Sequence, residues 1–421
     1  MELSLFGQKF TSKSGILQLM DDLGKPLPPD VPAYRLGGGN PARIPEIEKI
    51  FRREMYRILE DGDNFERTIG CYDSPQGRES FLTAMARLLS LKFGWKIGPE
   101  NIAVTNGSQS GFFYLFNMFS GSTGKGKKNK ILFPLVPEYV GYADQGIEPD
   151  TFVTLPAKAE YYENNTFKYF IDFQLLEDYL SKHPEISALC VSRPTNPTGN
   201  VLTNEEIVRL ANTAEKFGIY LMVDNAYGTP FPNIIFNESQ PYWDPSVILS
   251  MSLSKIGLPT TRTGIIIAEE KIIKLLSAVN SIIALASTSI GQAIAENLVL
   301  SGEILKISKE IVQPFYQNRA IQTEKWIREI FKDRNWMLHK SEGAIFQWLR
   351  LCDMPFTSLE LYKELKKHGV IVVPGEYFFF GEGGINHEHL HQCIRINYSG
   401  PQDEVYQGLK IIEEVSRAGN S

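Results

Sequence analysis

Lys255 is the residue whose type and position say most about chemistry in this sequence. It follows the apolar run Val247–Met251, which is typical of a buried strand, and the small polar residues between them indicate a loop. A lysine at the mouth of a sheet is costly to bury unless its pKa falls or its amine bonds covalently to a partner. A neutral amine there could form a Schiff base with a carbonyl compound. A single lysine after a strand is more often an ordinary surface residue, so other segments must show whether Lys255 belongs to a functional site.

A second segment has the composition of an anion site. Asn106-Gly-Ser108-Gln109-Ser110 follows the expected strand Asn101–Thr105 and precedes the helical run Gly111–Phe119. Free backbone N–H groups and the helix dipole favour phosphate at such a helix start. The same residues could instead be a plain helix cap, so this segment alone does not decide.

Two further strands end in polar residues. The strand Ala188–Val191 leads into a loop in which two prolines and a glycine present Asn196 rigidly. Asp224 closes the strand Tyr220–Val223 and needs a cationic partner, because a lone buried carboxylate is costly. The protonated ring nitrogen of pyridoxal phosphate (PLP) would be such a partner, worth about 4 kcal/mol at ~4 Å and an effective dielectric near ~20. Tyr227 follows one helical turn later, within reach of the ring oxygen.

The four clusters should meet, since ligands of an open parallel sheet bind beyond the carboxyl ends of its strands. The last cluster adds Ser252 and Arg262, and both could bind a phosphate, the arginine bidentately. Together the clusters predict a PLP site.

The order Ser-Gln, Asn-Pro-x-Gly, Asp-x-x-Tyr, Ser-x-x-Lys and a later Arg resembles the fold-type-I aminotransferases, the aspartate aminotransferase superfamily, over nearly the whole chain. The resemblance implies that Lys255 binds PLP covalently and moves the substrate proton. It also implies that Asp224 pairs with the ring nitrogen, and that Asn196 and Tyr227 bond to the phenolic oxygen.

The resemblance assigns further roles around the cofactor and substrate. The residues implied for the phosphate are Ser108, Gln109, Ser252 and Arg262, and Tyr139 would stack on the ring. Arg395 would bind the substrate carboxylate, and Gly38 would lie where the substrate passes close to the backbone. Tyr72 would reach the phosphate of a neighbouring subunit, which implies a homodimer with shared sites.

The sequence departs from dicarboxylate-specific members of the family in the segment after the lysine. No Lys or Arg occurs between Lys274 and Lys306, and Ile282–Thr288 is apolar or small. We therefore expect a neutral, apolar substrate. Within the family the resemblance extends to bacterial enzymes acting on valine and pyruvate, which implies that transfer, with 2-oxoisovalerate and alanine as products. Other neutral amino acids, and lyase chemistry on the same cofactor, remain alternatives. A PLP-binding sensor domain of a transcription regulator would need a basic DNA-binding segment, which we do not find.

Length and strand–helix alternation predict the architecture. A chain of 421 residues exceeds the size of one core, so two domains are expected. Alternating strands and helices predict an α/β fold whose large domain, residues 49–300, has a mainly parallel doubly wound sheet. Residues 1–48 and 301–421 should form a smaller α+β domain from both chain ends. Its expected elements are a long helix over Glu303–Ile330 and strands at Ala344–Leu351, Val370–Val373 and Cys393–Asn397.

Composition argues against several other classes of protein. The net charge of −6 without a basic stripe argues against nucleic-acid binding. No signal sequence is evident, and no apolar run reaches the ~18 residues of a membrane span. The four cysteines form no CxxC pair, which predicts neither disulfides nor zinc and fits the cytoplasm.

Two motifs invite other readings. Gly121–Lys128 nearly matches a phosphate-binding loop, but a lysine stands where Ser or Thr is required and a helix precedes it, so we predict a surface loop. His387, His389 and His391 would share one face of a strand and could bind metal. We expect no metal and instead a place at the rim of the substrate entrance.

Overall fold

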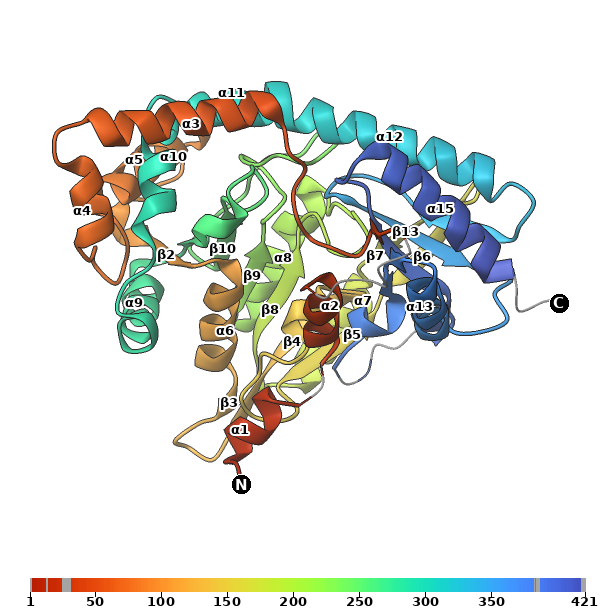
Figure 1. The fold of residues 1–421 in the computed structure, drawn as a ribbon. Helices are drawn as coiled ribbons and strands as arrows, with labels where there is room; N and C mark the ends of the chain where they lie inside the picture. Colours follow the sequence, from red (N-terminus) through yellow and green to blue (C-terminus); the bar gives the residue numbers. More distant parts are fainter. Residues whose placement is uncertain (1, 13, 25–31, 382, 384–386, 418–421) are drawn as a thin grey trace.

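The computed structural model describes residues 2–12, 14–24, 32–381, 383 and 387–417. Its larger sheet has the order β2-β11-β10-β9-β8-β4-β3, with β5 paired to β4 (Figure 1). Strands β10, β9, β8, β4 and β5 run parallel, whereas β11 is antiparallel to both β10 and β2. The bounds are β2 (Ile102–Asn106), β3 (Gly121–Ser122), β4 (Lys128–Val136), β5 (Phe152–Pro156), β8 (Ile186–Ser192), β9 (Tyr220–Asp224), β10 (Val247–Ser252) and β11 (Thr263–Ile267). Six of these strands are predicted by short apolar runs, and these strands and the mainly parallel α/β sheet are confirmed. The runs are Asn101–Thr105, Lys130–Phe133, Ala188–Val191, Tyr220–Val223, Val247–Met251 and Gly264–Ala268.

Helices follow these strands because their apolar residues recur on one face. In α5 (Glu79–Phe93) the sequence spacing predicts one apolar face, and it is buried except for the half-buried Phe93. That face consists of Phe81, Leu82, Met85, Leu88, Leu89 and Phe93. The Thr-x-x-Glu spacing of Thr203 and Glu206 predicts a capping box, and the two residues form one at the start of α8 (Asn204–Phe217). The remaining helices associated with this sheet are α3 (Pro45–Glu60), α4 (Asn64–Gly70), α6 (Ser108–Phe119), α7 (Phe173–Lys182), α9 (Glu270–Ala284) and α10 (Ser289–Leu300).

A second sheet has the order β15-β16-β13-β12-β7-β6. Its strands are β6 (Lys158–Tyr162), β7 (Thr166–Phe170), β12 (Trp336–His339), β13 (Phe346–Leu351), β15 (Val373–Pro374) and β16 (Cys393–Asn397). The hairpin β6–β7 comes from the middle of the chain and pairs with β12 in parallel. The domain boundaries predicted above stay a prediction.

Two elements of this second part differ from expectation in detail. The predicted helix over 303–330 is α11 (Glu303–Ile307), a π-helical turn (Ser308–Val312) and α12 (Gln313–Ile330). The predicted strand at 370–373 is divided, because β14 (Val370–Ile371) pairs with β1 (Tyr34–Arg35) while β15 pairs with β16. Helices α13 (Ser358–Lys367) and α15 (Gln402–Arg417) cover this region.

The two N-terminal helices lie across both parts of the molecule (Figure 1). Lys9 in α1 (Leu5–Phe10) donates to the Glu148 carbonyl at 3.0 Å. Asp22 in α2 (Gly15–Gly24) accepts hydrogen bonds from Tyr362 and, at 2.7 Å, from Lys366 of α13. The segment therefore connects the edge of the large sheet to the helices of the second sheet.

The histidine cluster is helical, so the strand assumed for it is wrong. The segment forms α14 (His387–Gln392), and His389 is 1% exposed, with hydrogen bonds to Tyr169 at 2.5 Å and Arg350 at 2.9 Å. Burial lowers the pKa of His389 to about 4. A rim position is therefore wrong for His389, whose ring is part of the packed interior. Among the described residues, no group of three or more His, Cys, Asp or Glu side chains is arranged to hold a metal.

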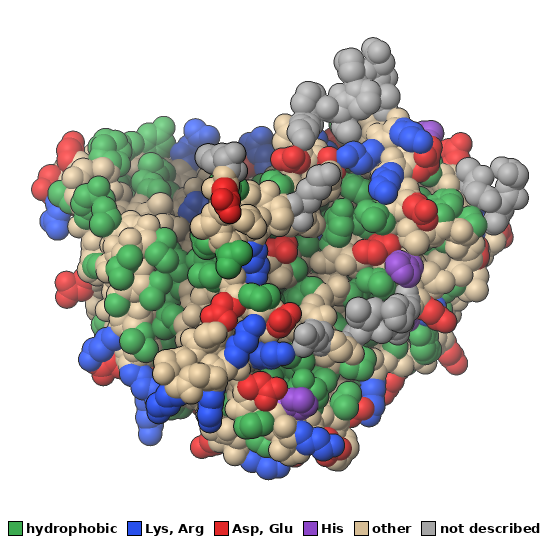
Figure 2. All heavy atoms as spheres, turned by 90° about the horizontal axis from the view of Figure 1, so that it is seen from below, with side chains coloured by type: hydrophobic (Ala, Val, Ile, Leu, Met, Phe, Trp, Pro, Cys, Tyr) green, Lys and Arg blue, Asp and Glu red, His purple; other side chains and the backbone are tan. Residues whose placement is uncertain are grey.

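The glycine-rich loop, the surface charges and the lengths of the helices bear on the remaining expectations. The glycine-rich stretch 121–128 is β3, an exposed turn and the start of β4, which confirms the surface loop. Acidic and basic side chains are interspersed on the face shown in Figure 2. Within the described part of the chain, none of the helices combines the length and apolar character that a membrane crossing requires.

Candidate active site

A cavity of about 180 Å³ lies beyond the carboxyl ends of β8, β9 and β10. Every predicted site residue lines this cavity except Gly38 and Tyr72. Those that line it are Ser108, Gln109, Tyr139, Asn196, Asp224, Tyr227, Ser252, Lys255, Arg262 and Arg395. Residues distant in sequence meet here because parallel strands end at the same edge of the sheet.

Lys255 lies in this cavity with its amine held in place. Its Nζ donates to the carbonyl of Gly39 at 2.7 Å and lies 5.3 Å from the ring centroid of Tyr227. Burial, together with the positive charge of Arg395, lowers the pKa of Lys255 to about 8. A substantial fraction of the amine is thus neutral near physiological pH, as a nucleophile requires.

Asp224 is oriented by two donors. Its Oδ1 accepts from the backbone N–H of Ala226 at 3.0 Å, and its Oδ2 accepts from the hydroxyl of Tyr142. Burial raises the pKa of Asp224, while the two hydrogen bonds oppose that rise. The carboxylate therefore has fixed geometry and a strong need for a cationic partner.

The start of α6 is built to approach an anion. Gly107 has φ +82°, and no side chain caps the helix, so the first N–H groups are not bonded by a capping residue. A Cβ on Gly107 would lie 2.1 Å from Nη2 of Arg262, so only glycine leaves room for the guanidinium. Arg262 itself has φ +48°, a strained value for a non-glycine residue that is typical of functional sites.

The other predicted anion ligands border the same space. Gln109 donates through Nε2 to the Gly141 carbonyl at 3.0 Å. The hydroxyl of Ser252 accepts from the backbone N–H of Ser254 at 3.0 Å, which leaves the hydroxyl proton available to a ligand. The site thus combines hydroxyl, guanidinium and helix N–H donors.

Arg395 comes from β16 of the second sheet and crosses to the cavity. Its Nη1 donates to Asn196 Oδ1 and its Nη2 to the Gly37 carbonyl, both at 2.6 Å. The guanidinium is 2% exposed and stacks 4.1 Å above the ring of Phe346, and its Nε is buried without a hydrogen-bond partner in the structure. Burial lowers its pKa to about 10. An unpaired buried donor is costly, so the geometry favours an anionic ligand here.

Two predicted residues are not in the cavity. Gly38 is buried, with its carbonyl accepting from Asn397 Nδ2 at 2.6 Å, and its neighbour Gly39 lines the cavity instead. Tyr72 follows α4, is 86% exposed and borders a different surface cavity. Neither residue therefore lines this cavity in its own chain.

Sequence reasoning missed part of the lining. Ile16, Leu19 and Met20 of α2 form an apolar wall, and their i, i+3, i+4 spacing was the available signal. Tyr142 was also missed, although it stands only three residues after Tyr139. The apolar wall and Tyr142 are brought to the cavity only by the tertiary structure.

Comparisons with known proteins agree with this arrangement. The sequence matches the family described as Aminotransferase class I and II over residues 45–412. It is 47% identical over 419 residues to the valine–pyruvate aminotransferase of Escherichia coli, covering 99% of each chain. A solved valine–pyruvate aminotransferase from Salmonella typhimurium is 44% identical, with a TM-score of 0.86 over 96% of this chain and 100% of the other. At 20% identity, the kynurenine aminotransferase of Pyrococcus horikoshii, solved with PMP, shares the fold with a TM-score of 0.79 over 98% and 96% of the two chains.

Proposed function

Because the chain belongs to the class I and II aminotransferases, a PLP-dependent family, we propose that it exchanges the amino group between valine and pyruvate. The products would be 2-oxoisovalerate and alanine. The observation that carries the proposal is the juxtaposition, in one cavity, of the Lys255 amine, the Asp224 carboxylate and the partly unpaired Arg395 guanidinium. The two relatives named for this reaction support the choice of substrates.

The donor set of the cavity fits PLP. A phosphate would take the N–H groups of α6, Ser108, Gln109, Ser252 and Arg262, which offer the hydroxyl and guanidinium donors that such a group requires. Asp224 would pair with the ring nitrogen, and Tyr139 would stack on the ring. When bound, PLP supplies an electron sink for negative charge at the substrate Cα.

The residues of the chain then have distinct tasks. Lys255 would hold the cofactor covalently and, once released by the incoming amine, move a proton at the substrate Cα. Its lowered pKa suits a group that must be neutral to accept that proton. Asn196 and Tyr227 would donate to the phenolic oxygen, Asn196 through its amide nitrogen because its Oδ1 accepts from Arg395. This assignment leaves both ends of the Asn196 amide occupied.

The walls of the cavity support a neutral, apolar amino acid. Arg395, which lines the cavity, would bind the α-carboxylate through N–H groups that its bonds to Asn196 and Gly37 do not use. The side chains of Ile16, Leu19 and Met20 offer an apolar surface to the rest of the substrate. Besides Arg395, the cationic side chains that line the cavity are Lys255 and Arg262, and both are assigned to the cofactor.

The arrangement of subunits is a further part of the proposal. We propose a cytoplasmic homodimer in which Tyr72 completes the phosphate site of its partner. The 86% exposure of Tyr72 supports this, as do the exposed apolar side chains of Ile69 in α4 and Ile282 and Ile283 in α9. Figure 2 shows the molecule from below, and hydrophobic side chains gather on its left side. This is the side on which α4 and α9 lie in Figure 1. The four cysteines are free thiols, as expected in a reducing compartment.

The domain assignment belongs to the same proposal. Residues 49–300 would form the PLP-binding domain, and residues 1–48 with 301–421 the smaller one. The larger sheet, which lies within residues 102–267, supports the first assignment, and the position of Arg395 on β16 supports a contribution of the second to substrate binding.

Reduction of the PLP-loaded protein with borohydride tests the central assignment. The modified peptide should contain Lys255, and the unreduced protein should convert valine and pyruvate to 2-oxoisovalerate and alanine. Lys255→Ala should lose both properties, whereas Lys271→Ala, at an exposed lysine of α9, should keep them. An adduct on another lysine, or turnover by Lys255→Ala near the unsubstituted rate, would contradict the proposal.

A further inference from the structure

Tyr142 is a buried tyrosine whose hydroxyl reaches the carboxylate at the centre of the cavity. It ends the short 3-10 helix Val140–Tyr142, and its side chain is fully buried. The hydroxyl donates to Oδ2 of Asp224. Since Ala226 donates to the other oxygen at 3.0 Å, both carboxylate oxygens are held.

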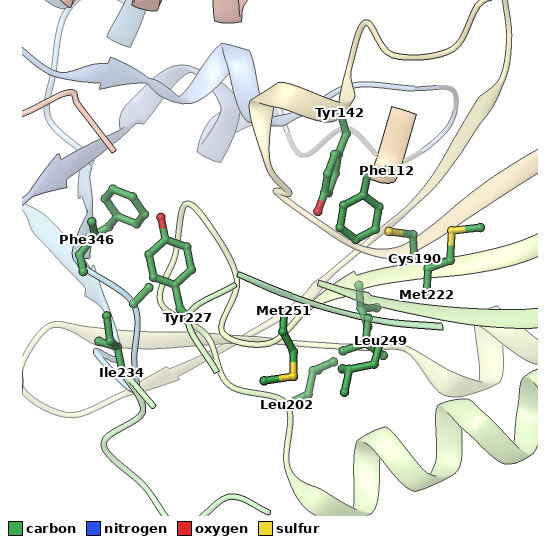
Figure 3. Packing of buried hydrophobic residues seen from close by; sticks show 14 of the residues in the cluster. Phe112, Tyr142, Cys190, Leu202, Met222, Tyr227, Ile234, Leu249, Met251 and Phe346 are labelled. Carbon is green, nitrogen blue, oxygen red and sulfur yellow. The ribbon is translucent and has the colours of Figure 1, made fainter. Parts of the chain in front are cut away.

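Aromatic packing fixes the direction of this hydroxyl. The ring of Tyr142 lies 5.0 Å from Phe112, 5.2 Å from Phe116 and 5.9 Å from Phe133, measured between centroids. Figure 3 shows Tyr142 beside Phe112, with Tyr227 across from this pair. Burial raises the pKa of Tyr142 well above its usual value, so the hydroxyl keeps its proton and acts as the donor.

A second buried carboxyl group, that of Glu138, stands nearby. Glu138 accepts from the backbone N–H of Ser192 at 2.9 Å, from the Ser192 hydroxyl at 2.7 Å and from the backbone N–H of Tyr139 at 2.8 Å. Burial nevertheless raises the pKa of Glu138 to about 8, with a contribution from the charge of Asp224. Two adjacent buried carboxylates repel each other, so one of them tends to keep a proton. Six titratable groups of the surrounding elements interact electrostatically with Asp224. They are Glu138, Tyr139, Tyr142, Cys190, Tyr227 and Lys255.

We propose that Tyr142 is a positioning residue, whose hydroxyl keeps Asp224 ionised and aimed at the ring nitrogen of PLP. The inference rests on the proposed function, because it concerns how the chain would hold that cofactor. A hydrogen bond to the carboxylate makes Asp224 a weaker base, so the shared proton stays on the ring nitrogen and not on Asp224. The ring then remains cationic, which is the form that withdraws electrons from the substrate Cα.

Nitrogen NMR of the holoenzyme reconstituted with ring-¹⁵N PLP reads this proton directly, without turnover. In Tyr142→Phe the ¹⁵N signal should move toward the value of a neutral pyridine. The kcat for valine should fall about tenfold or more while KM changes little, as expected for the loss of one hydrogen bond to a charged group. If Tyr142→Phe does not fold, 3-fluorotyrosine at this position tests the same bond: its more acidic hydroxyl is a stronger donor to Asp224, so the ¹⁵N signal should move further from the value of a neutral pyridine, and an unmoved signal would contradict the proposal.

Tyr169→Phe is the matched control, because it removes another buried hydroxyl, which lies on β7 of the second sheet and bonds to His389 of α14. It should leave the ¹⁵N signal unchanged. A wild-type signal in Tyr142→Phe, with borohydride still forming the adduct at Lys255, would overturn the assignment of Tyr142 alone. Failure of the wild-type protein to form that adduct would overturn the proposed function, and this inference with it.

Discussion

The contribution of Arg395 to substrate recognition can be separated from its contribution to stability by the substitution Arg395→Lys. A lysine keeps the positive charge but cannot present several N–H donors in a fixed plane. In the structure the two terminal nitrogens of Arg395 already bond to Asn196 and Gly37, and Nε is the donor without a protein partner. The substitution therefore removes the geometry that would bind a carboxylate.

The size of the effect follows from the bond that is lost. A hydrogen bond to a charged group contributes about 1.5–3 kcal/mol, and each ~1.4 kcal/mol changes an equilibrium tenfold. We expect kcat/KM for valine to fall by about ten- to a hundredfold. Isobutylamine has the same side chain and no carboxylate, so its much slower reaction with the PLP-loaded enzyme should change little.

Single-turnover reactions followed by the absorbance of the cofactor supply both rates. Arg350→Lys is the matched control, since Arg350 is 8% exposed on the neighbouring strand β13 and bonds to Gln392, Glu388 and His389 outside the cavity. It should affect stability and leave the ratio of the valine and isobutylamine rates unchanged. An equal loss for both amines in Arg395→Lys would refute carboxylate binding by this residue.

Three further predictions follow from the same cavity. Because the pKa of Lys255 is lowered to about 8, the neutral fraction of its amine increases with pH up to that value. The rate at which the apoprotein captures PLP, measured by trapping with cyanoborohydride, should therefore rise about tenfold per pH unit below pH 8 and level off above it. A flat profile would contradict the assignment. Met20→Arg, at a cavity-lining residue that is 59% exposed, should raise kcat/KM for glutamate relative to valine about fivefold, as a partly exposed ion pair of ~1 kcal/mol allows, whereas Leu17→Arg outside the cavity should not. Mixed dimers of Lys255→Ala and Tyr72→Ala should recover one intact site, and mixtures of Lys255→Ala with Arg395→Ala should recover none; equal recovery would exclude shared sites.

Local patterns in the sequence predicted six strands of the larger sheet, though not β3 or β5, and ten of the residues that line the cavity. Apolar runs ending in Asp224 or Lys255 identify both the strand and the edge at which its last polar residue lies, because parallel strands present their carboxyl ends together. The capping box at Thr203 is likewise a local interaction, so its residues alone predict where α8 begins.

The histidines of α14 show where local pattern fails. Alternating residues suggested a strand, yet tertiary contacts with Tyr169 and Arg350 bury His389 in a helix. Similarly, β14 and β15 pair with different strands, which no pattern within 370–374 can reveal. Pairing depends on partners supplied by distant parts of the chain.

The sequence by itself predicted which residues meet in the cavity, because Lys255, Asp224 and Asn196 each follow an apolar run that is typical of a strand. Only the tertiary structure decided what surrounds these groups. The wall from α2 and the hydroxyl of Tyr142 come from segments far from Asp224 in sequence. Burial and charge at a site are sums over every neighbour in space, so the ionisation of Asp224 and Lys255 depends on contacts that local spacing does not encode.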